Sequence, residues 1–299
     1  MSDGAAGAWP PLPLEGWRET YATLHMWTQV VGKVCIAATT LANHWWNIAF
    51  RVTSRGFSTP LLRAGDRIFA MEFDFVAHRL LIRCEDGSSE TLPLEPRTVA
   101  DFYAATMQAL ARLGIAVRIW TMPVEVPEPI RFELDTKHRS YDPTAANAFF
   151  RALVSMTPVL ERFRCRFVGK CSPVHFFWGS FDLAVTRFSG RRAPARPGAD
   201  AITREAYSHE VISHGFWPGG GAVADAAFYA YAAPEPDGFR TAAIRPAAAT
   251  YRTDLGEFIL PYDAVRTSAR PEETLTAFVE STYDEASRLA QWDRAALER

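Results

Sequence analysis

The same short fragments occur twice along this chain, in the same order. The fragment VVGK (Val30–Lys33) returns as FVGK (Phe167–Lys170), and LPLEPRT (Leu92–Thr98) returns as LPYDAVRT (260–267). Between these fragments a tryptophan stands at the same spacing before a Val-Thr pair, once as Trp45 and once as Trp178. Repeated fragments in a constant order are typical of an internal duplication, which demands two halves of one architecture. The alternative is that two unrelated segments share them by chance.

Periodicity and capping signals predict that each half contains a helix, an antiparallel sheet and a second helix. Asp142 and Pro143 suit the start of the third helix, and Thr98 suits the start of the second. Turns such as the DGS at Asp86 favour hairpins, and the helices do not alternate with strands as in a doubly wound parallel sheet. The predicted fold is therefore α+β, with two pseudo-repeated halves and the helices packed on one sheet face. Helices are expected over residues 17–32, 98–114, 143–163 and 271–289, and strands over 45–53, 68–75, 80–84, 90–94, 116–121, 174–188, 209–214, 227–232, 248–252 and 257–260.

The predicted boundaries follow from this repeat. The first half should span residues 15–126 and the second half 143–292, with a flexible tail over 1–14, a linker over 127–142 and one compact unit overall. The second half also contains two Pro-, Gly- and Arg-rich insertions that are expected to be loops, Ser189–Glu205 and Ala233–Pro246. Loops added to one copy of a repeat often determine specificity.

Composition narrows the class of protein. With 299 residues, 48% of them hydrophobic and 22% charged, the chain can bury a large core. A net charge of −2 argues against a nucleic-acid-binding domain, which normally has a basic excess. The four cysteines lack metal-type spacing, and no apolar segment approaches the roughly 18 residues of a membrane span. Because the N-terminal stretch also lacks the pattern of a signal peptide, we expect a cytoplasmic protein that binds neither nucleic acid nor membranes.

The predicted strand at 174–188 has two faces of different character. Side chains alternate across a strand, so Phe181 and Leu183 lie on an apolar face while Trp178, Ser180 and Asp182 lie on the other. A large aromatic side chain beside small and acidic ones is typical of a ligand pocket. A solvated sheet face and a subunit interface are the alternatives. The residues predicted to bind ligand, from this strand, its counterpart in the first half and neighbouring elements, are Trp45, Asn47, Arg51, His175, Trp178, Ser180, Tyr229 and Tyr231.

The segment SHEVISHGFW (Ser208–Trp217) supplies a second set of candidates. The spacing of His209 and His214 does not fit the HExxH motif of zinc peptidases. On a strand, Glu210 and His214 share a face, so we predict a catalytic acid–base set of Glu210, His214 and Asp182. A purely structural hydrogen bond is the alternative. No metal site is predicted, and the chain has no nucleophile elbow, dinucleotide fingerprint or phosphate-binding P-loop, so no motif indicates a cofactor.

Three longer segments resemble a known family: RFVGKCSPVHFFWGSFDLAVTRFSGR, REAYSHEVISHGFWPGGG and LHMWTQVVGKVCIAATTLANHWWNI. The chain is similar to bacterial proteins of about this length that are classed together as a domain of unknown function. The resemblance extends from about Trp17 to Leu297. It implies one coherent bacterial unit and brings no activity, substrate or catalytic residue with it.

The leading functional expectation is the binding of a small molecule in an aromatic and acidic cleft on the polar sheet face. Asp182 and Glu210 would accept hydrogen bonds or a proton there. The first alternative is an enzyme of undefined reaction that uses the Glu210, His214 and Asp182 set. The second is a protein-interaction module that uses the aromatic face, and homodimer formation stays open.

Overall fold

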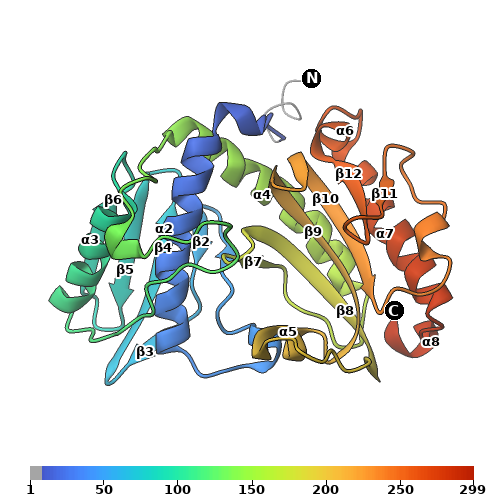
Figure 1. Ribbon diagram of the computed structural model, residues 1–299, viewed down its shortest axis with the longest axis horizontal. Helices are drawn as coiled ribbons and strands as arrows, with labels where there is room; N and C mark the ends of the chain where they lie inside the picture. The colour runs from blue at the N-terminus through green and yellow to red at the C-terminus, as the bar shows by residue number, and fades with distance from the viewer. Residues whose placement is uncertain (1–8) are drawn as a thin grey trace. The chain divides into compact units, whose positions relative to one another are not determined.

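The computed structural model describes residues 9–299, which form two compact units (Figure 1). The first unit comprises residues 15–150 and 176–181, and the second comprises residues 9–14, 151–175 and 182–299. Each unit has a six-stranded antiparallel sheet with helices, so the predicted α+β fold is confirmed. Both follow the predicted order of helix, sheet and helix, while the duplication itself stays a prediction.

The first unit is built around a sheet in which the strands follow the order β1-β2-β4-β5-β6, with β3 also paired to β4. One face of β4 carries Phe69, Met71 and Phe73, all buried. The helices cover this face, as the stacked rings of Phe73 and Phe102 show, and Trp27 in turn stacks on Phe102 at 4.7 Å between ring centroids. The elements are η1 (Leu14–Gly16), α2 (Arg18–Ala38), η2 (Asn43–Trp45), β1 (Arg51–Val52), β2 (Gly56–Ser58), β3 (Leu62–Ala64), β4 (Arg67–Asp74), β5 (Arg79–Cys84), β6 (Ser89–Pro93), α3 (Val99–Arg112), η3 (Phe132–Leu134) and the start of α4 (Pro143–Cys165).

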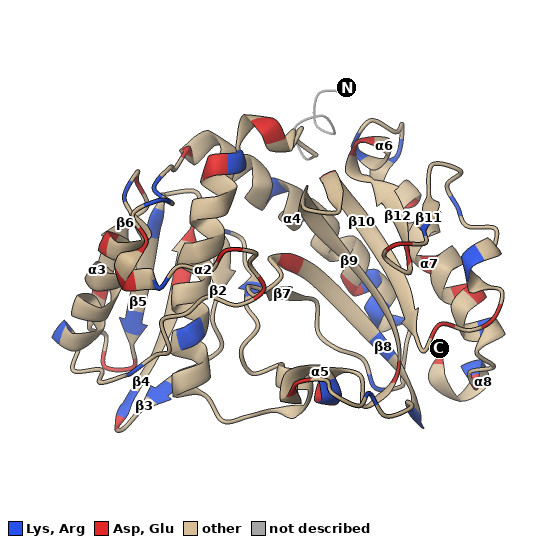
Figure 2. Cartoon of the chain, in the orientation of Figure 1, with Lys and Arg blue, Asp and Glu red and all other residues tan. Residues whose placement is uncertain are grey.

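The second unit has its sheet in the order β11-β12-β10-β9-β8-β7, and β9 and β10 form a long hairpin. Helices α4 and α7 lie behind this sheet in the view of Figure 1. The long central strands carry few charged side chains (Figure 2). After α4 the elements are β7 (His175–Phe177), β8 (Asp182–Arg192), α5 (Ala201–Ala206), β9 (His209–Gly220), β10 (Val223–Ala233), η4 (Phe239–Thr241), β11 (Thr250–Arg252), β12 (Glu257–Pro261), α6 (Tyr262–Arg266), α7 (Pro271–Leu289) and α8 (Arg294–Leu297).

Capping residues begin two helices where the sequence predicts them. The Thr98 hydroxyl accepts a hydrogen bond from the Asp101 N–H at the start of α3. The Asp142 carboxylate accepts one from the Thr144 N–H at 2.8 Å, immediately before Pro143 in the first turn of α4. These side chains satisfy backbone donors that have no partner inside the helix.

Left-handed residues interrupt two of the predicted strands. His44 and Trp45 have φ angles of 56° and 59°, so residues 43–49 form a 3₁₀ turn and a bend, and only Arg51–Val52 remains a strand. Phe181 has a φ of 59°, and the turn at residues 178–181 separates β7 from β8. A non-glycine residue in this conformation cannot continue an extended strand.

Two smaller predictions also need correction. The strand predicted over residues 116–121 is absent, and these residues have no regular structure. The first helix does not end at Gly32 but continues to Ala38, so Gly32 is not a cap. Of the predicted tail, residues 1–8 lie outside the described residues, whereas Trp9 and Leu12 are buried and the Tyr262 hydroxyl donates to the Pro10 carbonyl at 3.0 Å. No helix within residues 9–299 has the length and apolar character to cross a membrane.

Candidate functional site

The two faces of the second sheet follow from its register. Val185 pairs with His214, and His214 pairs with Ala230, so these side chains share one face. This is the face covered by helices, because His214 contacts Phe163 of α4 and Thr282 of α7. The adjacent row, Ala184, Gly215 and Tyr229, therefore points to the opposite side, which we call the open face.

A tyrosine and a carboxylate meet across the middle of the open face. The Tyr229 hydroxyl on β10 donates a hydrogen bond to the Asp182 carboxylate on β8, so the side chain spans the intervening strand β9. Gly215 lies beneath it on β9. A Cβ atom at Gly215 would come within 2.3 Å of the Tyr229 hydroxyl oxygen and 2.4 Å of the Leu183 carbonyl oxygen. Glycine at this position thus makes room for the tyrosine to reach Asp182.

Two further tyrosines extend this arrangement. Tyr231 stacks beside Tyr229 with 6.1 Å between ring centroids, and its hydroxyl lies 3.1 Å from that of Tyr207, which follows α5. The guanidinium of Arg196 sits 3.9 Å from the centre of the Tyr207 ring. This face therefore already holds one organic cation against a tyrosine ring.

Glu257 is the second carboxylate of the open face. Tyr229 pairs with Ile259 and Ala230 with Phe258, so the next pair places Glu257 on β12 beside Tyr231 on β10. Burial and, secondarily, the negative charge of Asp182 raise the pKa of Glu257 to about 7. We refer to Asp182, Tyr207, Tyr229, Tyr231 and Glu257 as the tyrosine–carboxylate cluster.

Glu257 stands beside an arginine that is engaged elsewhere. Its cross-strand neighbour Arg252 donates two hydrogen bonds to Asp254, at 2.8 and 2.7 Å. Over residues 9–299, Glu257 makes neither a hydrogen bond nor an ion pair. A carboxylate that is partly withdrawn from water without a cation is costly to ionise, which accounts for the raised pKa.

The tyrosines are suited to donate hydrogen bonds at neutral pH. Burial, followed by the charge of Asp182, raises the pKa of Tyr229 well above its ordinary value, and burial does the same for Tyr231. Both phenols thus keep their protons. They can stabilise a carboxylate by hydrogen bonding, but they do not neutralise its charge.

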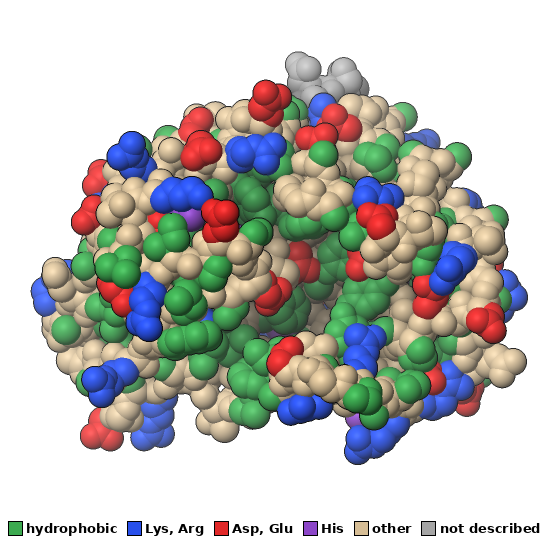
Figure 3. Space-filling model, viewed as in Figure 1, with side chains coloured by type: hydrophobic (Ala, Val, Ile, Leu, Met, Phe, Trp, Pro, Cys, Tyr) green, Lys and Arg blue, Asp and Glu red, His purple; other side chains and the backbone are tan. Residues whose placement is uncertain are grey.

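The end of the open face near the β9–β10 turn is apolar. Val223, Ala227 and Ile259 form a small buried cluster, and Trp217 and Leu255 pack against it. Where this sheet is visible in Figure 3, over β8 to β10, hydrophobic and tyrosine side chains make up much of the surface. The open face therefore combines apolar and aromatic surface with a few polar groups, the usual composition of a small-molecule site.

The predicted catalytic set does not come together. His214 is fully buried on the helix-covered face, where its Nε2 lies 2.8 Å from the Thr282 hydroxyl, and burial lowers its pKa to about 3. Glu210 pairs with Arg191 at 2.6 Å, and Arg191 also donates to the Ala290 carbonyl at the end of α7. Asp182 lies on the opposite face of the sheet from His214. Glu210 and His214 share a face of β9, as the alternation predicts, but each already has a structural partner and Asp182 lies on the other face. The structural alternative therefore fits Glu210 and His214.

Trp178 is a core residue of the first unit. Its Nε1 donates to the Ile48 carbonyl at 2.9 Å, and only 3% of the residue is exposed. A Cβ atom at Gly32 would lie 2.2 Å from the Trp178 ring. Gly32 thus lets the indole pack directly against α2, which explains a glycine in the middle of that helix.

The remaining predicted ligand-binding residues are distributed over both units. Asn47 accepts a hydrogen bond from the Ala42 N–H and donates to the Thr39 hydroxyl, so it stabilises the loop after α2. His175 is buried in β7, and Ser180 is exposed in the turn that follows. The first unit contains Trp45, Asn47, Arg51, Trp178 and Ser180, whereas the second contains His175, Asp182, Glu210, His214, Tyr229 and Tyr231.

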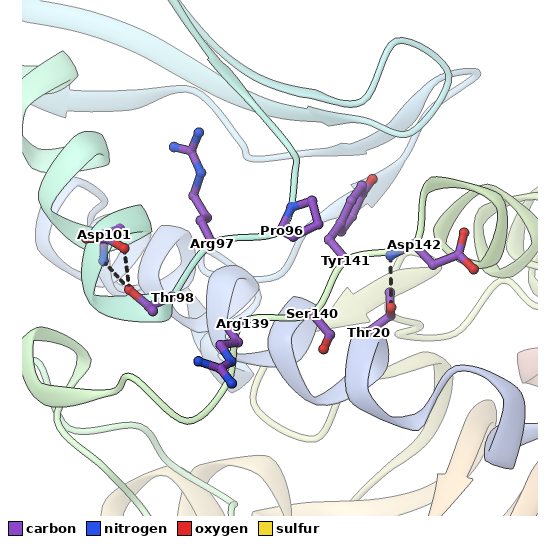
Figure 4. Close-up of a pocket in the computed structure, with 9 residues that line it drawn as sticks. All are labelled: Thr20, Pro96, Arg97, Thr98, Asp101, Arg139, Ser140, Tyr141 and Asp142. Atoms are coloured by element: carbon purple, nitrogen blue, oxygen red, sulfur yellow. Dashed lines mark hydrogen bonds between the residues drawn. The ribbon is translucent and has the colours of Figure 1, made fainter.

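A depression of about 590 Å³ in the first unit is a weaker candidate site (Figure 4). Arg97 and Arg139 line it, but their guanidinium groups point in opposite directions. The Thr98 hydroxyl is already used to cap α3. These polar side chains therefore do not point toward a common ligand. Within residues 9–299, no group of three His, Cys, Asp or Glu side chains is placed to hold a metal ion.

Sequence reasoning missed Glu257, Tyr207 and Gly215. The alternation of Tyr229 and Tyr231 along one strand was a usable signal, and both were predicted to bind ligand. The pairing of β12 with β10, which brings Glu257 beside them, has no local signature because η4, β11 and their connecting loops separate the two strands along the chain.

Comparison with known proteins identifies the family of the chain. It belongs to a family of unknown function (DUF5996), whose model matches residues 9–299. The resemblance to an uncharacterised family is thereby confirmed. Neither a curated protein nor a solved structure matches the chain.

Proposed function

We propose that the second unit binds a small organic cation on the open face of its sheet, at the tyrosine–carboxylate cluster. The observation that carries the proposal is that Glu257 is partly buried and has no cationic partner within the described chain. It belongs to the same cluster as Asp182, which accepts a hydrogen bond from the Tyr229 hydroxyl. A ligand with an amine, guanidinium or quaternary ammonium group would supply the missing charge.

The aromatic side chains support the same ligand class. Tyrosine faces attract cations, and Arg196 on the Tyr207 ring is an example within the chain. Trp217 and the apolar cluster beside Tyr229 would accommodate a hydrocarbon portion of the ligand. An amphipathic cation therefore fits better than a metal ion, which would require converging oxygen ligands.

The pH dependence of binding follows from Glu257. Its pKa of about 7 means that the carboxylate is about half protonated at neutral pH in the free protein. A cation binds the ionised form better, so affinity should rise as pH increases from about 6 to 8.

The test compares benzylamine with benzyl alcohol, a neutral molecule of similar shape, by isothermal titration calorimetry. We expect benzylamine to bind with a Kd on the order of 1 mM or tighter and benzyl alcohol to bind at least about tenfold more weakly. Asp182→Asn and Glu257→Gln should each weaken benzylamine binding. Glu72→Gln in the other unit is the matched control and should leave it unchanged. Equal binding of the two probes, or unchanged binding by both cluster variants, would contradict the proposal.

Acid–base catalysis by the same cluster is a second candidate, which the pKa of Glu257 favours. A carboxyl group that titrates near 7 beside another carboxylate can act as a general acid or base at physiological pH. Turnover would be screened with amine-bearing esters, amides and glycosides. An enzyme of this kind should show a pH profile of kcat/KM with a midpoint near 7 that disappears in Glu257→Gln. Turnover with an unchanged profile in that variant would exclude Glu257 from catalysis.

A further inference from the structure

A stripe of polar side chains runs along a buried side of α2 in the first unit. His25, Gln29 and Lys33 follow one another at intervals of four residues, which places them on the same side of the helix. Their exposed fractions are 8%, 0% and 4%. Buried polar groups normally require partners, so each member of the stripe needs an explanation.

The first two members have complete structural explanations. The Gln29 side chain donates to the Val124 carbonyl at 2.7 Å and accepts from the Val124 N–H at 2.8 Å. The His25 Nε2 lies 2.8 Å from the Gly179 carbonyl oxygen. Both side chains therefore hold neighbouring segments of the first unit against α2.

Lys33 has no comparable partner. Its Nζ lies 4.5 Å from the centre of the Trp120 ring and 5.9 Å from that of Trp178, both within cation–π range. In the described chain its ammonium group makes neither a hydrogen bond nor an ion pair. Trp178 is buried, whereas Trp120 is 62% exposed. The amine is therefore within cation–π range of one buried indole and one indole that is exposed to solvent.

We propose that Lys33 is a nucleophilic amine that condenses with an aldehyde whose flat aromatic body stacks on Trp120. The neutral Nζ attacks the carbonyl carbon to give a carbinolamine, and loss of one water molecule leaves an imine. No oxidant or reductant is needed, and the reaction reverses by hydrolysis. The site lies within the first unit and uses no residue of the tyrosine–carboxylate cluster, so it stands independently of the proposed function.

The chemistry of lysine supports this assignment. Lys33, Lys137 and Lys170 are the only lysines among the 32 lysine and arginine residues of the chain. An arginine at this position would stack equally well on tryptophan but would never deprotonate. Burial lowers the pKa of Lys33, and each unit of lowering raises the fraction of neutral amine about tenfold. Two of the titratable groups on neighbouring elements are His25, whose pKa burial lowers to about 4, and Glu125, whose carboxylate lies against Gly179.

The experiment is reductive benzylation of the full-length protein with benzaldehyde and sodium cyanoborohydride at pH 7, followed by peptide mass spectrometry. We expect Lys33 to be labelled at least several-fold faster than the exposed Lys137 and to be labelled at a lower pH. Lys33→Arg, which retains a cation beside the tryptophans, controls for folding and should abolish the fast phase. Labelling of Lys33 no faster than that of Lys137 would overturn the proposal.

A second variant tests the role of Trp120. Because Trp120 is largely exposed, Trp120→Ala should leave the fold intact. We expect it to slow benzylation of Lys33 several-fold while methylation by formaldehyde, which has no aromatic body to stack, is not slowed. Equal slowing with both aldehydes, or no slowing with benzaldehyde, would contradict a stacking site at Trp120.

Discussion

Both sheets carry acidic residues on the face opposite their helices, but the two units stabilise these residues in different ways. In the first unit, Asp74 pairs with Arg55 and Arg79, and Glu72 pairs with Arg83. In the second unit, Asp182 receives a tyrosine hydroxyl and Glu257 has tyrosine neighbours. The first arrangement uses cations, whereas the second includes neutral phenols.

The pKa values of the carboxyl groups express this difference. Burial raises the pKa of Asp74, but the hydrogen bonds from Arg55 and from the N–H groups of Ala77 and Val76 outweigh it, so the net pKa is lowered. Burial and Asp182 together raise the pKa of Glu257 to about 7. A carboxylate with arginine partners forms a structural ion pair and stays ionised. A carboxylate beside tyrosines can still bind a proton or a cationic ligand.

The largest effect is expected from Asp74→Ala. Asp74 is fully buried, and its removal abolishes contacts to two arginines and two backbone N–H groups. We expect the free energy of unfolding to fall by about 3 kcal/mol. Urea unfolding followed by circular dichroism would measure the change. Asp182→Ala is the matched substitution in the second sheet and should cost less, because the Tyr229 phenol that it leaves behind carries no charge. Equal losses would remove the distinction between the two faces.

Gly215→Ala in the second sheet should have the next largest effect on the free energy of unfolding. The new methyl group would collide with both the Tyr229 ring and a backbone carbonyl, so we expect a loss of about 1–3 kcal/mol in the free energy of unfolding. Binding of benzylamine should weaken as well, since Tyr229 can no longer reach Asp182.

A double-mutant cycle with Tyr229→Ala checks the cause of that loss. If the collision with Tyr229 matters, Gly215→Ala should cost less in the Tyr229→Ala background than in the wild-type protein. Additive losses would assign the whole effect to the Leu183 carbonyl and would remove Gly215 from the description of the site.

Several features of the two sheets could be read from the sequence. The alternation along β4 and β8 places Met71 and Leu183 inward, and Glu72 and Asp182 on the other face, as the register confirms. Helix starts at Thr98 and Asp142 were also predictable, because capping depends on residues only a few positions apart.

Other features depend on contacts that no local pattern encodes. The residues around Phe181 do not indicate that its backbone is left-handed rather than extended. The alternation of side chains therefore predicts a strand where the structure has the turn before β8. Trp178 was assigned to a pocket because its contact, Gly32, lies in a distant helix. Glu257 joins the cluster only through the pairing of β12 with β10. The individual strands were thus predictable, whereas the residues that converge from different strands were not.

Glu257→Gln should change how stability depends on pH. The pKa of Glu257 is raised in the folded state, so the wild-type protein loses stability as pH rises from about 4.5 through 7, and glutamine removes this loss. Relative to wild type, the variant should gain about 2–3 kcal/mol between pH 5 and pH 8. Urea unfolding at several pH values would measure the difference between the two proteins, which cancels contributions from other titrating groups. A difference that does not vary with pH would contradict the raised pKa.

The smallest effect is expected from Arg83→Gln in the first sheet. The Arg83 side chain is 56% exposed, and its partner Glu72 also accepts a hydrogen bond from the Thr53 hydroxyl. An exposed ion pair contributes little, so the free energy of unfolding should fall by less than about 1 kcal/mol, and the change should shrink further in 0.5 M salt. Urea unfolding at low and high salt would measure it. A loss as large as that of Asp74→Ala would mean that the first sheet depends on its whole arginine network. A small loss would show instead that burial of the carboxylate, more than the presence of an arginine, determines how strongly each face depends on its charges.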